Sequence, residues 1–366
     1  MNIFSLILHK RIFRLEGHIL NIEQKSNNYD ILDLVKFILS LMVVAIHTKL
    51  FPKYLYPWLR IAVPMFFIIS SYLLNMKIIN SPKEEKWIII RKYIKRLVLY
   101  YLFWFIVLIP FTVDRRTEWF NYGIKNGIIL FIRCLLFTST FVASWYISAT
   151  IIGTLIVYKL SEKINDIALC IIYMIIFGIC CIISSYSYLY QNIEIIKKII
   201  NSFTQFIASP IFSFPVALIY IHIGKLFAEN KMKIFKYKNK VYLFFSVLFA
   251  ILLYIEWRYS IKQNKVFNKD CYFVLLPFCF SLFSLIKGIT IKLKNPKLLR
   301  KVSNITYPLH GSIAFFIQDN MPEWIKKQSL KGIFNFIVTL FIVYLICFII
   351  IKLERKKCFK FLKYSH

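Results

Sequence analysis

Residues 31–50, ILDLVKFILSLMVVAIHTKL, are the stretch that decides the fold. Nearly all of them are apolar, and a helix of about 20 apolar residues spans the hydrocarbon core of a bilayer. A segment in lipid has to satisfy its own backbone hydrogen bonds, so only helices and closed barrels cross membranes. A run this long and continuous indicates a membrane-spanning helix.

Similar apolar runs follow along the whole chain. Together with the first they give ten predicted spans, at about 31–50, 60–79, 96–113, 144–160, 167–186, 208–228, 241–257, 271–288, 302–319 and 333–351. Residues 127–142 are too short and too interrupted to span, and we expect an interfacial or re-entrant segment there. The predicted fold class is all-α, a polytopic transmembrane helix bundle of about ten spans.

Composition agrees with a membrane protein. Hydrophobic residues make up 59% of the 366 residues, against about 45–50% in soluble domains, and such a chain is too apolar to be disordered. The formal net charge of +31 is typical of nucleic-acid binding as well. However, Lys and Arg are spread over all the connecting segments, so we expect no nucleic-acid partner.

The distribution of positive charge predicts the topology. With both termini in the cytoplasm, the inside segments carry 31 Lys and Arg, the outside loops carry 16, and Lys36 lies within the first span. Cytoplasmic loops are enriched in Lys and Arg, so both termini are predicted to be cytoplasmic. The Ile, Lys, Asn and Phe bias is typical of a low-GC bacterial genome. We therefore expect a multi-pass protein of the bacterial cytoplasmic (inner) membrane, surrounded by membrane lipids.

The remaining segments are short. Residues 1–30 lack a small-residue cleavage site and are predicted to be a cytoplasmic amphipathic segment instead of a signal peptide. Residues 31–351 form the transmembrane domain, and 352–366 form a basic cytoplasmic tail. The eight cysteines lie in or beside apolar spans without a CxxC motif, so we expect neither disulfides nor a bound metal.

The first span carries a seam of polar residues. Asp33, Lys36, Ser40 and His47 fall within an arc of about 100° on one helix face, and Lys36 and His47 are about 16 Å apart along the axis. Ionisable residues inside a membrane indicate function by default. Two simpler interpretations stay open: Asp33 and Lys36 pair with each other at the interface, and His47 is a packing residue hydrogen-bonded to a neighbour.

Cationic residues flank this seam. Arg60 begins the second span near the outer end of the first, where it either approaches His47 or serves as an interfacial anchor. Before the third span, Lys92, Lys95 and Arg96 form a basic cluster. This cluster is either a clamp for the phosphates of a cytosolic cofactor or a topology signal that contacts anionic lipid.

Later spans add aromatic and imidazole groups. Trp145 and Tyr146 lie in SWYISA, and Trp and Tyr most often mark membrane interfaces. His222 is close to the cytoplasmic end of its span and is interpreted as structural. His310 lies a few residues into the ninth span, and the sequence leaves its role open.

The first two spans resemble the opening of the acyltransferase-3 family of integral membrane O-acyltransferases. The family pattern has an Asp, an Arg three residues later and a His eleven residues beyond that, followed by R-x-x-x-P-x-F-F and S-G-Y. The corresponding positions in this sequence are Asp33, Lys36, His47, Arg60, Pro64, Phe66, Phe67, Ser70 and Tyr72.

The resemblance extends more loosely over nearly the whole chain. SWYIS is similar to the family's H-L-W-F-L segment, with Trp145 at the Trp, and SNITYP is similar to the late S-x-x-T-Y signature, with Ser303, Thr306 and Tyr307. Three departures from the family pattern lie in the first three spans: Lys36 replaces Arg, Ser71 replaces Gly, and Tyr93 replaces the first Arg of the family's R-x-x-R motif, which precedes the third span. In the later segments, Ser144 stands near a common His, His310 at a position often held by Tyr, and Ile313 near a later His.

The resemblance implies that residues 31–351 are a membrane-embedded O-acyltransferase domain. Such an enzyme moves an acyl group, acetyl in the first instance, from cytosolic acyl-CoA to a hydroxyl of an extracytoplasmic glycan or lipid-linked sugar. Acyl-CoA is then the donor substrate, and no metal is expected. The alternative is a membrane transporter or flippase for a polysaccharide or small solute, which would also use buried ionisable groups.

The resemblance also implies roles for individual residues. His47 would be the general base or the acyl carrier, and Arg60 would stabilise the developing oxyanion. Asp33 would orient the first-span cation. The residues expected to bind the CoA phosphates are Lys36, Lys92, Lys95 and Arg96, and those expected to bind substrate or to support the motifs are Ser70, Tyr72, Trp145, Thr306, Tyr307 and His310.

Overall fold

The computed structural model describes residues 29–52, 54–112, 121, 123–207, 209–231, 239–263, 269–328 and 330–366. The predicted amphipathic segment 1–30 therefore lies almost entirely outside the described residues. The described residues form helices, turns and loops, and no strand occurs among them. The predicted all-α fold class is confirmed for this part of the chain.

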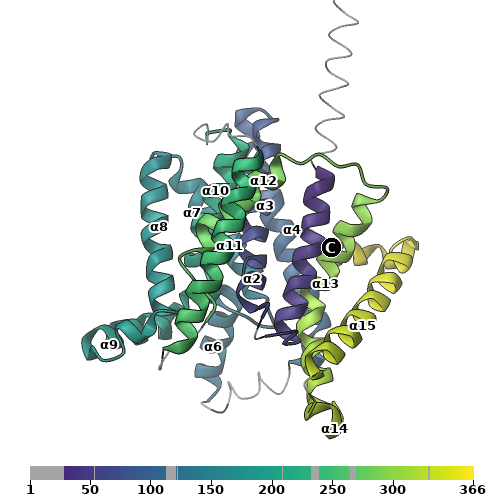
Figure 1. Ribbon diagram of the computed structural model, residues 1–366. Helices are drawn as coiled ribbons and strands as arrows, with labels where there is room; N and C mark the ends of the chain where they lie inside the picture. Colours follow the sequence, from purple (N-terminus) through teal and green to yellow (C-terminus); the bar gives the residue numbers. More distant parts are fainter. Residues whose placement is uncertain are drawn as a thin grey trace, which may run out of the picture.

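Helices follow one another along the chain (Figure 1). The first is residues 29–47. The others are α2 (Tyr56–Leu59), α3 (Ala62–Ile79), α4 (Lys86–Val107), α6 (Ile124–Phe137), α7 (Trp145–Leu160), α8 (Asp166–Ile183), α9 (Glu194–Ile207), α10 (Phe214–Ala228), α11 (Asn239–Lys262), α12 (Leu275–Lys287), α13 (Pro296–Asp319), α14 (Glu323–Lys326) and α15 (Lys331–Leu353). Short 3₁₀ helices are η1 (Lys83–Glu85), η2 (Ile109–Phe111), η3 (Ser187–Leu189), η4 (Pro210–Phe212) and η6 (Lys357–Ser365).

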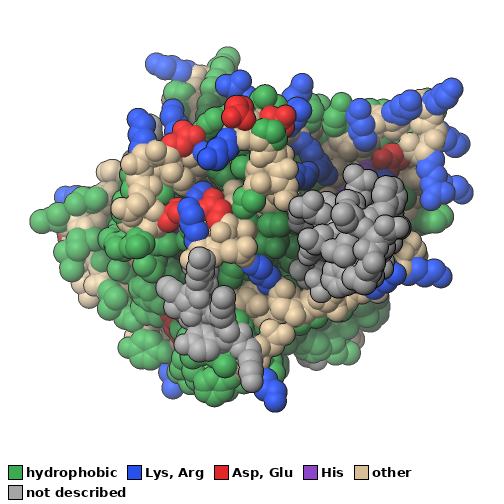
Figure 2. Space-filling model, turned by 90° about the horizontal axis from the view of Figure 1, so that it is seen from above, with side chains coloured by type: hydrophobic (Ala, Val, Ile, Leu, Met, Phe, Trp, Pro, Cys, Tyr) green, Lys and Arg blue, Asp and Glu red, His purple; other side chains and the backbone are tan. Residues whose placement is uncertain are grey.

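The long helices run in alternating directions through one bundle (Figure 1). Printed contacts join helix starts to helix ends: Lys86 of α4 pairs with Glu162 after α7, Asp166 of α8 with Lys225 of α10, and Lys301 of α13 with Glu354 after α15. We call this end, where helix 29–47 begins, the basic end, and the opposite end the far end. Seen from above, the basic end carries many more Lys and Arg than Asp and Glu side chains (Figure 2).

Each of the ten predicted spans coincides with a helix of the structure. Four of the described helical segments are long and apolar enough to cross a membrane, namely Tyr56–Ile79, Asp166–Ile183, Asn239–Lys262 and Lys331–Leu353. Shorter apolar helices are Trp145–Leu160, Phe214–Ala228 and Leu275–Lys287. The exact span count and the side of the termini stay predictions.

Several predicted span boundaries differ from the helix boundaries by four residues or more, and α4 and α13 extend furthest before the predicted starts. α4 begins at Lys86, not near 96, because the helix continues through the exposed basic stretch 91–96 before it reaches apolar surroundings. α13 begins at Pro296, not near 302, since a proline in the first turn is pre-organised for helix and lacks only a donor that would be unpaired there. Hydropathy marks the apolar part of a helix and does not mark its polar ends.

α3 and α10 form the centre of the bundle. The Ser71 hydroxyl donates to the Ile221 carbonyl oxygen at 2.6 Å. A Cβ atom at Gly224 would clash with the Ile68 carbonyl oxygen, so only glycine allows this close approach of the two helices. The Ser71 departure from the family pattern thus gives α3 a hydrogen bond to the backbone of α10.

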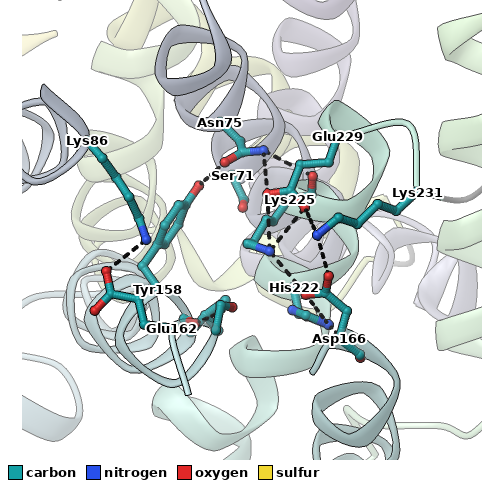
Figure 3. Close-up of polar contacts among 12 residues, drawn as sticks. Ser71, Asn75, Lys86, Tyr158, Glu162, Asp166, His222, Lys225, Glu229 and Lys231 are labelled. Atoms are coloured by element: carbon teal, nitrogen blue, oxygen red, sulfur yellow. Dashed lines mark hydrogen bonds and ion pairs between the residues drawn. The ribbon is translucent and has the colours of Figure 1, made fainter. Parts of the chain in front are cut away.

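A network of ion pairs fixes the basic end of these helices (Figure 3). Lys225 is 6% exposed, and its Nζ atom lies 3.1 Å from the carboxylates of both Asp166 and Glu229. Asn75 of α3 donates to the Lys225 carbonyl oxygen at 3.2 Å. His222 Nε2 lies 3.2 Å from the Asp166 carbonyl oxygen, so this histidine links α10 to the first turn of α8.

A second contact joins α4 to the turn after α7. Glu162 accepts hydrogen bonds from Lys86 Nζ at 2.9 Å and Trp87 Nε1 at 2.8 Å. These hydrogen bonds hold the pKa of the Glu162 carboxyl below its ordinary value. The contact crosses 75 residues of sequence and brings α4 and α7 together at the basic end.

The interrupted stretch 127–142 contains most of α6. This helix, Ile124–Phe137, exposes Ile128 and Ile132, and a turn through residues 138–144 leads into α7. Arg133 of α6 donates to the Thr204 carbonyl oxygen of α9 at 2.6 Å. A short helix followed by a turn therefore occupies this stretch, and its interfacial or re-entrant position stays a prediction.

The basic tail folds back onto the bundle. Trp104 of α4 donates from Nε1 to the Ser365 carbonyl oxygen at 3.0 Å, and Ser365 is fully buried. Arg96 of the same helix donates to the His366 carbonyl oxygen at 3.4 Å. The segment η6 thus covers part of α4 beside the basic cluster, a contact that the charge of residues 352–366 does not predict.

Candidate active site

Helix 29–47 and α13 are joined by contacts that occur in the same order along both helices. Asp33 pairs with Arg300, and the Lys36 carbonyl oxygen accepts from Ser303 at 3.0 Å. Further on, the ring of His47 lies 4.9 Å from the ring of His310. Because both residue numbers rise together, the helices run in parallel from the basic end to the far end. The polar face predicted for the first span faces α13.

His310 is the most deeply buried group of this contact. Its side chain is 0% exposed, and its Nδ1 atom lies 3.2 Å from the Thr306 carbonyl oxygen. A carbonyl oxygen only accepts, so Nδ1 carries the proton and Nε2 presents its lone pair. Nε2 is buried without a hydrogen-bond partner among the described residues. An unpaired buried acceptor is costly, so this atom is a candidate functional group.

Pro308 places this histidine. A proline inside a helix cannot donate to the carbonyl four residues earlier, here that of Asn304. Tyr100 of α4 supplies the missing hydrogen bond, since its hydroxyl donates to the Asn304 carbonyl oxygen at 2.7 Å. α4 therefore supports the interrupted helix one turn before His310.

His47 ends helix 29–47 and is half-buried. Its ring is tilted by 55° against that of His310 and lies edge-on to Phe315 at 6.0 Å. Arg60 lies within electrostatic range of His47. The approach of Arg60 to His47 stays a prediction, and His47 has a second imidazole as its neighbour.

At the far end, Arg60 is held by two polar groups. Its guanidinium pairs with the Asp270 carboxylate and the Tyr56 hydroxyl, and it lies 4.2 Å above the Tyr56 ring. The Tyr56 hydroxyl donates to Asp270 at 2.7 Å. Nε of Arg60 is buried without a partner among the described residues, which leaves one N–H donor of the guanidinium free.

A cavity opens beside this guanidinium, which we call the Arg60 cavity. Its volume is about 60 Å³. The lining residues are Ile46, Arg60, Val63, Pro64, Phe67, Trp145, Ile211, Phe212, Val216, Tyr220, Asp270, Cys271 and Leu275. Aromatic walls around one fixed ion pair are typical of small-molecule sites.

At the basic end, Asp33 is bound by Arg300 in a fork. Nε of Arg300 lies 2.8 Å from Oδ1, and NH2 lies 2.6 Å from Oδ2. Asp33 is 2% exposed, and these hydrogen bonds raise the pKa of the Arg300 guanidinium further above its ordinary value. The interpretation in which Asp33 pairs with Lys36 was wrong, because Asp33 forms its ion pair with Arg300.

Lys36 lies among charged groups of three helices. Asp33, Arg300 and Arg96 are all within electrostatic range of its ammonium group. Lys92 and Lys95 are exposed on α4. The charge of Arg96 therefore acts on Lys36, although Arg96 is exposed on α4, as Lys92 and Lys95 are.

Tyrosine side chains lie between the two ends of the bundle. Ser70 Oγ lies 3.0 Å from the Tyr146 hydroxyl, and the rings of Tyr146 and Tyr307 are 5.3 Å apart. Tyr307 donates to the Ala143 carbonyl oxygen at 3.0 Å. Ala143 has φ of 64°, in the left-handed region, so α13 contacts a strained turn before α7.

The remaining motif residues are more scattered. Trp145 lines the Arg60 cavity, and its ring lies 5.7 Å from that of Phe212. Tyr72 lies toward the basic end, where Lys287 Nζ is 5.8 Å from its ring. The Thr306 hydroxyl is buried without a partner among the described residues, and the Thr306 carbonyl orients His310. Of these three, Trp145 and Thr306 lie at the site and Tyr72 does not.

Sequence reasoning missed Arg300, Asp270 and Tyr56. Arg300 precedes the apolar part of its helix and was counted as a topology charge, although its spacing to Ser303 matches that of Asp33 to Lys36. Asp270 lies in a connecting segment with nothing in its sequence to mark it. Tyr56 is four residues before Arg60, the spacing of neighbours on a helix, and this was the available signal.

These features define a class of protein: a membrane-type helix bundle in which a histidine pair lies between a cationic end and an aromatic cavity. Residues 29–357 match the acyltransferase-3 family, described as an acyltransferase domain, and the chain belongs to this family. The match covers nearly the whole chain and supports an acyltransferase of the membrane.

Curated relatives carry a different name. An amino-acid racemase of Enterococcus faecalis is 26% identical over 345 residues, which are 89% of this chain and 46% of that protein. A second amino-acid racemase of this species is 25% identical over 278 residues, which are 72% of this chain and 36% of that protein. The chain thus spans less than half the length of these relatives. No solved structure gives a significant match.

Proposed function

We propose that this chain transfers an acyl group from cytosolic acyl-CoA to a hydroxyl of an extracytoplasmic glycan or lipid-linked sugar. The observation that carries the proposal is the His47–His310 pair, in which Nε2 of His310 is buried and has no hydrogen-bond partner among the described residues. The pair lies between two sites of different chemistry, a cationic cluster at the basic end and the Arg60 cavity at the far end.

The basic end suits the donor. Lys36, Arg96 and Arg300 bring three cationic side chains together, and Arg and Lys bind phosphate groups. Asp33 fixes Arg300 without neutralising the other two. Since Lys36 and His47 are about 16 Å apart along their helix, the acyl arm of a bound donor would extend along helix 29–47 toward the histidine pair.

The histidine pair suits proton transfer. Neutral imidazole is the usual general base near neutral pH. In the proposed step, the acceptor hydroxyl attacks the thioester carbonyl carbon while His47 takes the hydroxyl proton. In this step Nε2 of His310, which has no partner among the described residues, would accept a hydrogen bond from the other ring nitrogen of His47 and so orient it. Such a pair of base and orienting group activates nucleophiles. The carbon–sulfur bond then breaks, and His47 returns the proton to the departing CoA thiolate.

Arg60 suits the oxyanion. The carbonyl oxygen becomes negative when the hydroxyl adds, and a fixed N–H donor stabilises it most in a site that excludes water. Asp270 and Tyr56 hold the guanidinium, and in the part of the chain that the structure describes its Nε–H group has no hydrogen-bond partner. The aromatic residues Trp145 and Phe212 line the adjoining cavity, where the acceptor would bind.

The experiment measures acyl transfer and CoA release together. Membranes that contain the protein are given acetyl-CoA labelled in the acetyl group and crude envelope glycan. We expect label in base-labile esters and equal release of free CoA, both lost in H47A. A transporter would move solute without releasing CoA. Glycan that carries no label, together with solute transport that is the same in H47A as in the unaltered protein, would therefore contradict the proposal.

A further inference from the structure

Two buried cysteines lie against each other at the far end. The Sγ atoms of Cys181 and Cys271 are 3.5 Å apart, and both residues carry free thiols. Cys181 is in the last turns of α8, and Cys271 lies in the segment that leads into α12. Their exposed fractions are 0% and 3%. The contact joins positions 90 residues apart.

This thiol pair adjoins the Arg60 cavity. Cys271 lines that cavity and follows Asp270, the carboxylate that holds Arg60. Tyr220, which also lines the cavity, has both thiols within electrostatic range, and its buried hydroxyl has no partner among the described residues. Cys271 is therefore the member of the pair that borders the cavity.

The geometry permits a covalent bond after a small movement. A disulfide needs a sulfur–sulfur distance of about 2.05 Å, so the two sulfur atoms have to approach by about 1.5 Å. Cys181 is held in a helix, whereas Cys271 lies in non-helical backbone between residues 269 and 272. Rotation of both side chains and a slight shift of this segment supply the movement.

We propose that Cys181 and Cys271 form a reversible disulfide. The two thiols lose two protons and two electrons, one sulfur–sulfur bond forms, and a disulfide-bearing oxidant such as oxidised glutathione is reduced to two thiols. The predicted topology places the far end outside the cytoplasm, where disulfides persist. The bond ties α8 to the segment that carries Asp270, and it thereby fixes one wall of the Arg60 cavity.

The test counts oxidised thiols in the full chain. The purified, folded protein in detergent is treated with oxidised glutathione and is then denatured in the presence of N-ethylmaleimide, so that every free thiol, buried or exposed, is blocked. It is afterwards reduced and labelled with a polyethylene-glycol maleimide. We expect two labels in the unaltered protein and none in C181S or C271S. Mass spectrometry of peptides from the unaltered protein identifies the 181–271 linkage directly, so the test does not depend on the folding of a variant.

C180S is the matched control, because Cys180 is the buried neighbour of Cys181. It should keep both labels. Oxidation should also raise the unfolding temperature of the unaltered protein by at least about 2 °C, and it should leave that of C271S unchanged. A single label from a mixed disulfide with glutathione, a linkage through Cys180, or no label at all would overturn the proposal.

Discussion

The rings of His47 and His310 lie 4.9 Å apart and are tilted by 55° against each other, and they connect helix 29–47 to α13 near the far end of the bundle. Nδ1 of His310 is committed to the Thr306 carbonyl oxygen, so only its Nε2 atom is available to His47. A histidine whose tautomer is fixed by the backbone is suited to orient a second one.

The first prediction separates the two nitrogens of His310. In H310N, the amide nitrogen keeps the donor near the Thr306 carbonyl oxygen but nothing replaces Nε2. We expect acyl transfer to fall by about 10²-fold or more, with an unfolding temperature near that of the unaltered protein. H310Q, which restores a polar atom near the Nε2 position, should recover part of the rate. Equal rates in H310N and the unaltered protein would show that Nε2 has no role.

The second prediction concerns the free donor of Arg60. R60K keeps a positive charge beside Asp270 but loses the Nε–H group and the planar fork. We expect kcat to fall by about 10²–10³-fold, with little change in the KM for acetyl-CoA. Steady-state kinetics with acetyl-CoA as the varied substrate measure this split. A change confined to the KM for acetyl-CoA would mean that Arg60 binds the acyl donor instead.

The third prediction concerns the pair of Asp33 and Arg300. The side chain of Arg300 is 45% exposed, so solvent screens the pair in spite of its fork geometry. A double-mutant cycle of D33A and R300A should give a coupling free energy of unfolding of about 1 kcal/mol. A coupling near zero would mean that the fork does not join helix 29–47 to α13.

The two lysines at the basic end of α10 provide a stability prediction with its own control. The side chain of Lys225 is 7% exposed and lies between the carboxylates of Asp166 and Glu229, whereas the side chain of Lys231 is 53% exposed and lies beside the same two carboxylates. K225A removes the buried ammonium group and leaves the half-buried carboxylates of Asp166 and Glu229 paired with Lys231 alone, so it should cost about 2 kcal/mol of the free energy of unfolding. K231A should cost less than about 1 kcal/mol. Denaturant unfolding in detergent compares the variants, and equal costs would contradict the assigned burial.

The sequence predicted the fold class, the ten helical segments and the polar face of the first span. Hydropathy and the 3.6-residue period report one helix at a time, so they carry this information. The same signals do not say which helix packs beside which. Arg300 was therefore not identified as the partner of Asp33, and Asp270 was not identified as the partner of Arg60, because each pair joins segments more than 200 residues apart.

His310 illustrates the limit for the candidate site. Its position in the sequence is compatible with packing or with chemistry, and its spacing to His47 along the chain says nothing. Only the packed structure shows that Pro308, Tyr100 and the Thr306 carbonyl oxygen together fix its ring beside His47. The basic cluster shows the same limit, since only the structure shows that the charge of Arg96 acts on Lys36, although Lys92, Lys95 and Arg96 are all exposed.

The most direct measurement is the transfer of labelled acetyl from acetyl-CoA to envelope glycan by membranes that contain either the unaltered protein or H47A, at matched protein amounts. We predict ester-linked label with the unaltered protein and none above background with H47A. The H47A variant should insert into the membrane normally and keep the unfolding temperature of the unaltered protein. Ester-linked label at the same level with H47A would contradict the central role of the histidine pair.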